Sequence, residues 1–251
     1  MIQSLIFFPE KSFDDTPERH RLAYEEVSIQ VGPGVELFGW YFPAKNEKGV
    51  VIFFHGNAGN IAARLFKAEG WIKRGFSVLM VDYRSFGKST GQIQTGEDII
   101  EDSKRMLEWL IRNKKTPLEK IIFYGESLGS HPAIQLGSAY SAMGVILESP
   151  YTAFIDLAPI HYPWIPKFMT ELLLKNFAFD NLSLIPRLKS PLFILHGTED
   201  ETCPYLMSGK LMAAAPEPKK LFSIPGGMHN DLREKSGNAY WEEAIAFLQN
   251  Q

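Results

Sequence analysis

The sequence lacks the residues that mark several classes of protein. Among its 251 residues it has one cysteine, Cys203, so it cannot form an internal disulfide, and a reducing compartment fits best. Its 26 lysines and arginines nearly balance its 29 aspartates and glutamates, and the formal net charge is −3. Because this balance offers no basic surface for a polyanion, we expect no nucleic-acid partner.

Patterns for metals and organic cofactors are missing as well. The six histidines and the single cysteine form no closely spaced ligand set of the kind that holds zinc. The glycine-rich segment 55–60 has neither the Gly-x-Gly-x-x-Gly spacing of a dinucleotide site nor a P-loop ending. A Gly-Lys-Ser tripeptide occurs at 87–89, but Asp82 stands where a P-loop needs a glycine. We therefore expect no cofactor and no metal.

Long apolar runs are also scarce. Residues 127–147 carry no formal charge, yet their glycines, serines, histidine and proline make them too polar for a membrane helix. The start of the chain has no basic region and only a short apolar run at 5–9, so it predicts neither a signal peptide nor an anchor. These observations predict a cytoplasmic protein without an integral membrane segment.

The composition that remains is that of a globular enzyme-sized domain. Hydrophobic residues make up 45% of the chain and aromatic residues 13%, against 22% charged residues. That content is sufficient for a buried core and excludes a disordered or fibrous chain. Because single α/β domains commonly reach this length, we expect one domain over residues 1–251.

Eight short segments rich in β-branched and aromatic residues predict strands. The first two flank the turn Gly32-Pro33-Gly34 and therefore predict a hairpin. Most of the others are continuously apolar, which is typical of parallel strands covered on both faces. The predicted strands are 26–31, 37–42, 49–54, 76–81, 120–124, 144–147, 191–195 and 219–224.

Helical patterns alternate with these strands. The clearest spans 95–113, where an apolar stripe follows a Thr95-x-x-Asp98 capping box. Further helices are expected at 60–74, 128–140, 203–215 and 238–249. Alternation of this kind predicts an α/β protein with a doubly wound, mostly parallel sheet and right-handed crossovers.

Residues 151–190 interrupt the alternation. They combine prolines at 159, 163 and 166 with many apolar side chains, including Trp164 and Phe168. Since long insertions in compact domains are usually lids or binding loops, we interpret the segment as a small helical cap. A longer ordinary crossover helix is the alternative. The apolar side chains favour an apolar acyl group as ligand, but they would equally suit a core or a partner surface.

The sharpest local motif is Gly125-Glu126-Ser127-Leu128-Gly129. It fits the pattern G-x-S-x-G, and it lies directly after a predicted strand and before a predicted helix. In such a tight turn the small residues on either side lift the serine hydroxyl clear of the sheet. The motif predicts Ser127 as a nucleophile, against the alternative of a structural serine in a turn.

A serine nucleophile needs a base, which is in turn oriented by an acid. The last predicted strand is followed by His229, and the strand before it by Asp200. Because the carboxyl ends of parallel strands share one edge of a sheet, we expect both to meet Ser127 there. Three other carboxylates are candidates for the acid and stay open at this level: Glu199, Glu201 and Glu148.

Attack on a carbonyl also needs donors for the oxyanion. The N–H of Leu128 follows the nucleophile at a helix start, where free amides favour negative charge. A second donor is expected in the loop 55–60, and we favour the N–H of Asn57, although the loop would also suit a plain glycine-rich turn.

Taken together, these motifs resemble the alpha/beta-hydrolase superfamily along nearly the whole chain. The single-domain serine hydrolases related to protein depalmitoylases, and the catalytic domains of prolyl-oligopeptidase-type peptidases, are most similar. The blocks that carry the resemblance are 5–9, 55–60, 82–89, 125–129, 148–150, 196–200 and 226–230. The resemblance implies an eight-stranded sheet and hydrolysis through an acyl-enzyme, with Ser127, Asp200 and His229 as the triad. Ser85 departs from the family pattern, in which glycine is usual.

The expected activity is hydrolysis of carboxylic esters or thioesters of a small-molecule or acylated substrate. Peptide or amide cleavage would use the same residues, and a non-catalytic binding module would keep the same fold. Perhydrolase chemistry is a further alternative, because the fold does not choose among these activities. The sequence leaves the acyl chain length, the physiological substrate and the oligomeric state open.

Overall fold

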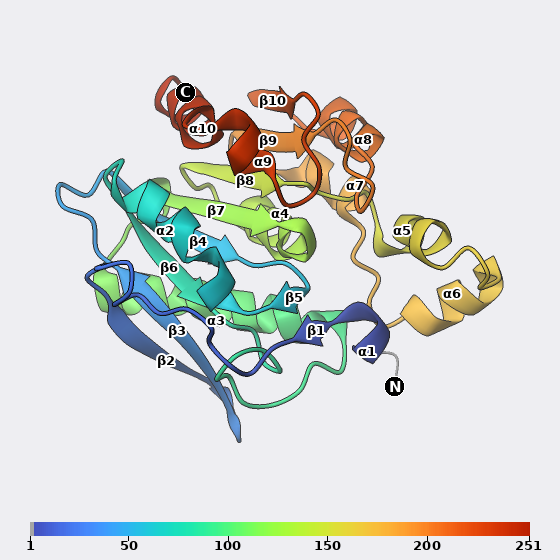
Figure 1. Ribbon diagram of the computed structural model, residues 1–251, viewed down its shortest axis with the longest axis horizontal. Coiled ribbons are helices and arrows are strands. Elements are labelled where there is room, and N and C mark those ends of the chain that lie inside the picture. Colours follow the sequence, from blue (N-terminus) through green and yellow to red (C-terminus); the bar gives the residue numbers. More distant parts are fainter. Residues whose placement is uncertain (1–2) are drawn as a thin grey trace.

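The computed structural model describes residues 3–251 and contains one large twisted sheet (Figure 1). All eight predicted strands are confirmed, with ends that differ from the predicted ones by two residues at most. The strands of this sheet are β2 (Glu25–Gly32), β3 (Val35–Phe42), β4 (Gly49–Phe54), β6 (Phe76–Val81), β7 (Ile121–Glu126), β8 (Gly144–Glu148), β9 (Leu192–Gly197) and β10 (Lys219–Ile224).

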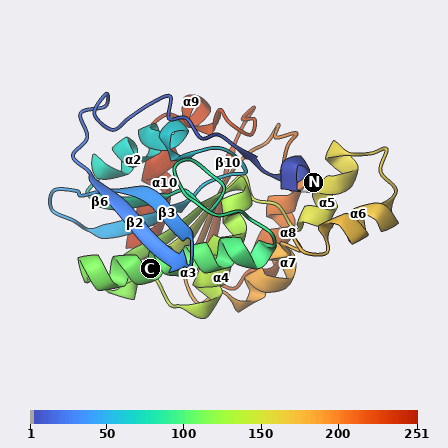
Figure 2. The same ribbon diagram turned by 90° about the horizontal axis from the view of Figure 1, so that it is seen from below.

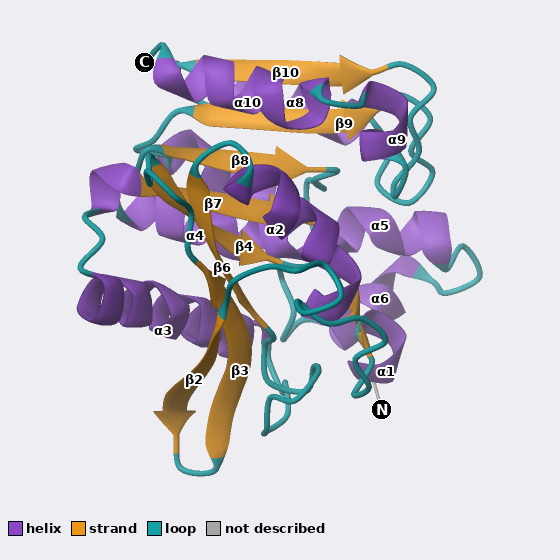
Figure 3. Cartoon of the chain, turned by 60° about the vertical axis from the view of Figure 1, so that its left-hand side comes forward, coloured by secondary structure: helices purple, strands orange, loops and turns teal. Residues whose placement is uncertain are grey.

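The sheet has the order β10-β9-β8-β7-β4-β6-β3-β2. Its neighbouring strands run parallel, except that β3 is antiparallel to both β2 and β6. The expected hairpin and the mostly parallel eight-stranded sheet are therefore confirmed. Figure 3 shows the hairpin extending from one end of the sheet, with β10 at the other edge.

The predicted helices are confirmed with shifted boundaries. The helix expected at 60–74 starts as a 3₁₀ turn, and a 3₁₀ turn over Ser127–Gly129 also precedes the helix expected at 128–140. The α-helices are α1 (Gln3–Ile6), α2 (Leu65–Ile72), α3 (Gly96–Lys114), α4 (Ser130–Ala139), α5 (Phe154–His161), α6 (Lys167–Leu174), α7 (Asn181–Leu184), α8 (Leu206–Ala214), α9 (Leu232–Ser236) and α10 (Ala239–Gln249). The 3₁₀ turn before α2 is Ile61–Arg64, and further 3₁₀ turns are Leu118–Lys120 and Ile185–Arg187.

The capping box at the start of α3 is present as predicted. The Thr95 side chain accepts from the backbone of Asp98, whose carboxylate accepts from the N–H of Thr95 at 2.8 Å. The short elements α1 and α9 were not predicted from the sequence, nor was a two-stranded sheet of β1 (Phe8–Pro9) and β5 (Ala58–Gly59). These elements are too short to give a periodic pattern. Met1 and Ile2, where the chain was predicted to lack a leader, lie outside the described residues.

Helices cover both faces of the sheet (Figure 2). Because side chains alternate along a strand, Val50, Ile52 and Phe54 of β4 join the core under α3, α4 and α8, whereas Val51 and Phe53 join the core under α2 and α10. This double coverage explains why the parallel strands are continuously apolar in sequence.

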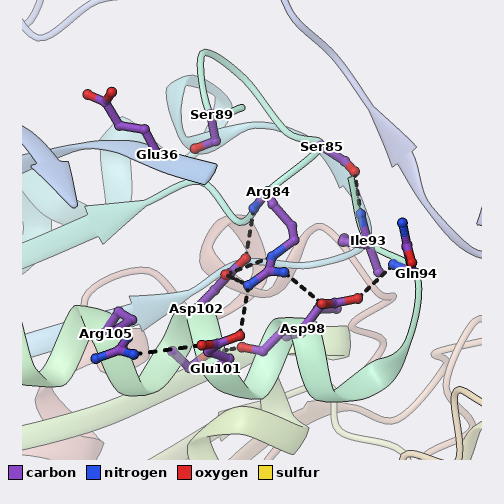
Figure 4. Close-up of polar contacts among 12 residues, drawn as sticks. Glu36, Arg84, Ser85, Ser89, Ile93, Gln94, Asp98, Glu101, Asp102 and Arg105 are labelled. Atoms are coloured by element: carbon purple, nitrogen blue, oxygen red, sulfur yellow. Dashed lines mark hydrogen bonds and ion pairs between the residues drawn. The ribbon is translucent and has the colours of Figure 1, made fainter. Parts of the chain in front are cut away.

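The loop after β6 is fixed to α3 by a charged cluster around Arg84 (Figure 4). The Arg84 guanidinium donates to Asp102 at 2.6 and 2.9 Å and to Asp98 at 2.6 Å, and it also pairs with Glu101 at 3.3 Å. The same loop contains Ser85 at φ 75°, a left-handed conformation that favours glycine and that accounts for glycine being usual there.

The segment 151–190 is helical, with α5 and α6 projecting beyond the sheet at the edge where the parallel strands end (Figures 1 and 3). Its apolar side chains divide into two sets. Trp164, Phe168 and Leu172 are mostly exposed, at 73%, 70% and 64%, whereas Phe177 and Phe179 are buried in the core. The segment therefore contributes both to the core and to an exposed apolar surface.

Candidate active site

Ser127 occupies a sharp turn at the end of β7. Its φ is 50°, in the left-handed region, where a non-glycine residue is strained by roughly 1–2 kcal/mol. The turn is possible because the residues around it are glycines. A Cβ on Gly125 would lie 2.2 Å from the Gly129 carbonyl oxygen, and one on Gly129 would lie 2.0 Å from the Phe54 carbonyl oxygen. The half-buried Ser127 side chain borders a cavity.

The loops after β9 and β10 are bonded to each other. The N–H of Glu199 donates to the Gly227 carbonyl at 2.9 Å, and the N–H of Gly226 donates to the Thr198 hydroxyl at 2.9 Å. Their backbones approach so closely that a Cβ on Gly197 would lie 2.1 Å from the Gly227 carbonyl oxygen. These contacts bring together the residues that come next along the two loops.

Asp200 and His229 are the residues that meet. The Nδ1 atom of His229 lies 2.7 Å from Oδ2 of Asp200, whose carboxylate is fully buried. The other carboxylate oxygen accepts from the N–H groups of Thr202 and Cys203, each at 2.8 Å. Since a carboxylate only accepts, His229 donates through Nδ1–H, which leaves Nε2 as its basic nitrogen.

A second imidazole shares the same carboxylate. His196 Nε2 lies 3.0 Å from Asp200 Oδ2 and 2.8 Å from the Cys203 carbonyl, so it carries the hydrogen, and its Nδ1 pairs with the Ser208 hydroxyl at 2.6 Å. Burial by itself would raise the pKa of Asp200. The hydrogen bonds from His196 and His229 outweigh burial and hold the pKa of Asp200 below its ordinary value, so the group is ionised at neutral pH.

The other candidate carboxylates lie elsewhere. Glu148 accepts from the hydroxyls of Tyr124 and Tyr240, both at 2.7 Å, and pairs with Lys67 on the opposite face of the sheet from α3 and α4. Glu199 and Glu201 are exposed. Asp200 is the one of the four that has a contact with His229 among the described residues.

The loop after β4 contains Asn57, and a buried histidine holds the peptide group that carries its N–H. His55 Nδ1 lies 2.8 Å from the Gly56 carbonyl, so it donates to that oxygen. In a trans peptide the N–H points away from the carbonyl, so this bond also orients the Asn57 N–H. Burial lowers the pKa of His55 to about 3, which keeps the ring neutral.

Asp82 lies beside this histidine, with its Oδ1 3.5 Å from His55 Nε2. The same oxygen accepts from the N–H of Ile61 at 3.0 Å, whereas Oδ2 is buried without a partner. Burial raises the pKa of Asp82 to about 8. Both groups are therefore uncharged at neutral pH.

Arg64 and Glu126 join that loop to the serine turn. The Arg64 guanidinium donates to the carbonyls of Ala58 and Asn60 at 2.8 and 3.1 Å and to the Glu126 carboxylate at 2.9 and 3.2 Å. Lys67 pairs with the same carboxylate. Although burial opposes it, these cations keep the pKa of Glu126 below its ordinary value. The ionised carboxylate of Glu126, which precedes Ser127, is thus connected through Arg64 to the loop 55–60.

Leu128 and Asn57 both border the cavity that Ser127 borders. Leu128 is in the first turn of the helical segment after the serine, where amides lack a carbonyl partner within the helix. The cavity has a volume of about 430 Å³, and much of its wall comes from α5, α6 and the connection between them, with Phe154, Leu157, Ile165 and Leu173. None of the described residues that line it is an aspartate or a glutamate.

Several residues of this site were not predicted from the sequence. They are His196, Arg64, and the pocket-lining Ile6 and Phe8. The block 196–200 marked His196 as part of a motif, but no spacing rule shows that its ring would share the Asp200 carboxylate. The block 5–9 likewise marked Ile6 and Phe8 as part of a motif, but it did not show that they line the cavity. Arg64 joins segments that are distant in sequence, which leaves no local signal.

Within residues 3–251, no cluster of three or more histidine, cysteine, aspartate or glutamate side chains could hold a metal ion. In the same part of the chain, every helix is too short or too polar to cross a membrane.

The sheet order and the helices on its two faces define an alpha/beta-hydrolase fold. An esterase from Pyrococcus furiosus has the same fold, with a TM-score of 0.78 and 22% identity over 98% of both chains. The family model Hydrolase_4, described as serine aminopeptidase, S33, matches residues 45–184, more than half of the chain. The protein therefore belongs to this family of hydrolases, and the resemblance seen in the sequence is confirmed.

Curated relatives match over nearly the whole chain. The alpha/beta hydrolase domain-containing protein WAV2 of Arabidopsis thaliana is 30% identical over 269 residues, which cover 98% of this chain and 87% of the relative. The uncharacterized protein YfhR of Escherichia coli is 30% identical over 237 residues, which cover 89% of this chain and 80% of the relative.

Proposed function

We propose that the protein hydrolyses carboxylic esters or thioesters with an apolar acyl group, through an acyl-enzyme on Ser127. The observation that carries this proposal is the hydrogen bond between His229 and the buried Asp200 carboxylate, at the sheet edge where the strained Ser127 lies. A base oriented by an acid is what a serine hydroxyl needs to act as a nucleophile at neutral pH.

In the first half-reaction, His229 Nε2 accepts the proton of the Ser127 hydroxyl while Oγ attacks the acyl carbon. The N–H groups of Asn57 and Leu128 donate to the resulting oxyanion, and each such donor is worth about 3–4 kcal/mol. The C–O or C–S bond then breaks, and the leaving alcohol or thiol takes the proton from His229. In the second half-reaction water attacks the acyl-enzyme with His229 as base, which releases the acid and restores Ser127.

The cavity supports an apolar acyl group. Its lining from α5 and α6 is mostly apolar, with His161 and Thr170 as the polar side chains, and an alkyl chain there gains about 0.8 kcal/mol for each buried CH₂. We interpret 151–190 as the cap that provides this lining within a single domain of residues 1–251.

Aminopeptidase activity is a second candidate, because the matching family is described by that activity. An aminopeptidase must bind a cationic α-amino group beside its nucleophile, and burying an unpaired ammonium is costly. The described lining of the cavity offers no carboxylate to pair with it, which favours ester substrates.

Matched substrates separate the two activities. The p-nitrophenyl esters from C2 to C16 should be hydrolysed with an optimum at intermediate chain length, whereas aminoacyl p-nitroanilides should not. S127A should abolish the ester hydrolysis, with a loss of at least ~10³-fold in kcat. Faster turnover of the anilides than of the esters would contradict the proposed substrate class.

A further inference from the structure

The N-terminal strap, defined as residues 6–10, is bonded to the loop that carries Asn57. In the β1–β5 pair, Phe8 lies opposite Ala58 and Pro9 opposite Gly59. The N–H of Phe8 donates to the Asn57 carbonyl at 2.8 Å, and the N–H of Glu10 donates to the Gly59 carbonyl at 3.0 Å. The backbone of the strap thus extends along the loop.

The strap also holds the side chain of Asn57. Its Nδ2 donates to the Ile6 carbonyl at 2.9 Å. The strap therefore binds both the carbonyl and the side-chain amide of Asn57. On the N-terminal side of the Asn57 Cα, His55 holds the Gly56–Asn57 peptide group through the Gly56 carbonyl. With both adjoining peptide planes fixed, the direction of the Asn57 N–H is fixed as well.

The same strap forms part of the cavity beside the serine. Ile6 and Phe8 line that cavity together with Ser127 and Asn57. Ile6 is 8% exposed, whereas Phe8 is 49% exposed, so the strap contributes one buried wall residue and one residue at the surface.

We propose that the N-terminal strap is part of the active site. Phe8 and Ile6 are positioning residues that orient the Asn57 N–H toward the oxyanion. Ile6 also limits the length of acyl chain that the cavity accepts. This inference rests on the proposed ester hydrolysis, since it assigns a purpose to residues of that same site.

Two substitutions at one position isolate the backbone hydrogen bond. F8P removes the N–H that binds the Asn57 carbonyl, and F8A removes the same ring but keeps the N–H. On the C2 ester, where the acyl pocket is barely used, kcat of F8P should fall about tenfold below that of F8A, with KM nearly equal, because a donor that is aimed poorly loses stabilisation in the transition state alone.

N57A provides a second variant that introduces no proline. It keeps the backbone N–H of residue 57 and removes only the side-chain bond to the Ile6 carbonyl. Its kcat on the C2 ester should also fall several-fold with KM unchanged, and its unfolding temperature should stay within a few degrees of the wild type, since one hydrogen bond contributes about 1 kcal/mol.

I6W tests the wall. A larger side chain at this buried position occupies space that a longer acyl chain needs, so kcat/KM for the C8 ester should fall at least about fivefold more than kcat/KM for the C2 ester. Equal losses on both esters would overturn the assignment of Ile6 to the acyl wall.

Other outcomes overturn the positioning role. Equal kcat values for F8P and F8A, or losses that appear in KM and in the unfolding temperature instead, would mean that the strap only stabilises the fold. If the wild type hydrolyses the esters and S127A does not, the proposed function holds regardless of the activities of the strap variants. A wild type without such hydrolysis would overturn the proposed function and this inference together.

Discussion

Asp200 and His229 meet through a 2.7 Å contact between Oδ2 and Nδ1, in which the carboxylate is fully buried and the imidazole is 14% exposed. The Asp200 carboxylate is thus held inside the protein, while the His229 ring remains at the border of solvent. A buried carboxylate in this position orients the ring and stabilises the imidazolium that forms when the base takes a proton.

The first prediction concerns this pair. D200N keeps the shape of the side chain but removes the charge that fixes the tautomer of His229, so kcat on esters should fall by about 10³–10⁴. E199Q is a matched control, because Glu199 is the exposed neighbour of Asp200 and its side chain has no part in the proposed chemistry. Loss of activity in E199Q with retention in D200N would mean that Asp200 is not the acid.

A second prediction concerns pH and Asp82. Its folded pKa of about 8 exceeds that of an unfolded aspartate, so the folded state binds more protons and should lose stability as pH rises toward 8. His55 and His131, whose pKa values burial lowers to about 3 and about 4, titrate in the opposite sense below about pH 6.5. Both rings are present in wild type and in D82N, so the comparison cancels the effect of His131 and leaves only the change that D82N makes in the titration of its neighbour His55.

The stability of D82N relative to wild type should therefore increase steadily from pH 5 to pH 8. Urea unfolding at four pH values across this range measures the difference. A difference that does not change with pH would mean that Asp82 is ionised in the folded protein.

The turn around Ser127 gives a third prediction. A Cβ on Gly129 would lie 2.0 Å from the Phe54 carbonyl oxygen, so G129A must displace either the serine turn or β4. The free energy of unfolding should fall by more than about 2 kcal/mol, and the esterase activity should be lost. A Cβ on Gly209 in α8 would have no neighbouring atom within 4 Å, so G209A should stabilise by about 0.5–1 kcal/mol. Thermal unfolding of the two variants compares the same chemical change in two environments.

The fourth prediction concerns the cluster in Figure 4. R84A leaves the fully buried Asp102 carboxylate without its cation, which should destabilise the protein by about 3 kcal/mol or more. R105A removes a partly exposed partner of Glu101 and Glu108 from the same helix and should cost less than about 1 kcal/mol. Similar losses in the two variants would show that the cluster contributes nothing beyond surface pairing.

The sequence predicted the fold well, because its signals are local. Continuous apolarity over 49–54 follows from burial on both faces of the sheet, and the Thr95 capping box marks the start of α3 directly. The motif around Ser127 predicted a tight turn, which the φ of 50° bears out. These features depend on neighbouring residues alone.

Other parts of the candidate site could not be predicted, because they depend on contacts between distant segments. His196 shares the Asp200 carboxylate only because a turn after β9 folds back on the strand. The pairing of Phe8 with Ala58 joins residues fifty positions apart, and two-residue strands have no periodicity to detect. The choice of Asp200 over Glu199 likewise depends on which side chain the turn buries.

The most direct test of the central claim is labelling with a fluorophosphonate, in which an activated serine oxygen displaces fluoride from phosphorus. Wild type should be labelled rapidly and stoichiometrically, with the phosphonyl group on Ser127 by peptide mass spectrometry, while S127A and H229A should remain unlabelled. A folded wild type that is not labelled, or a label at a different residue, would contradict the account of Ser127 as the activated nucleophile.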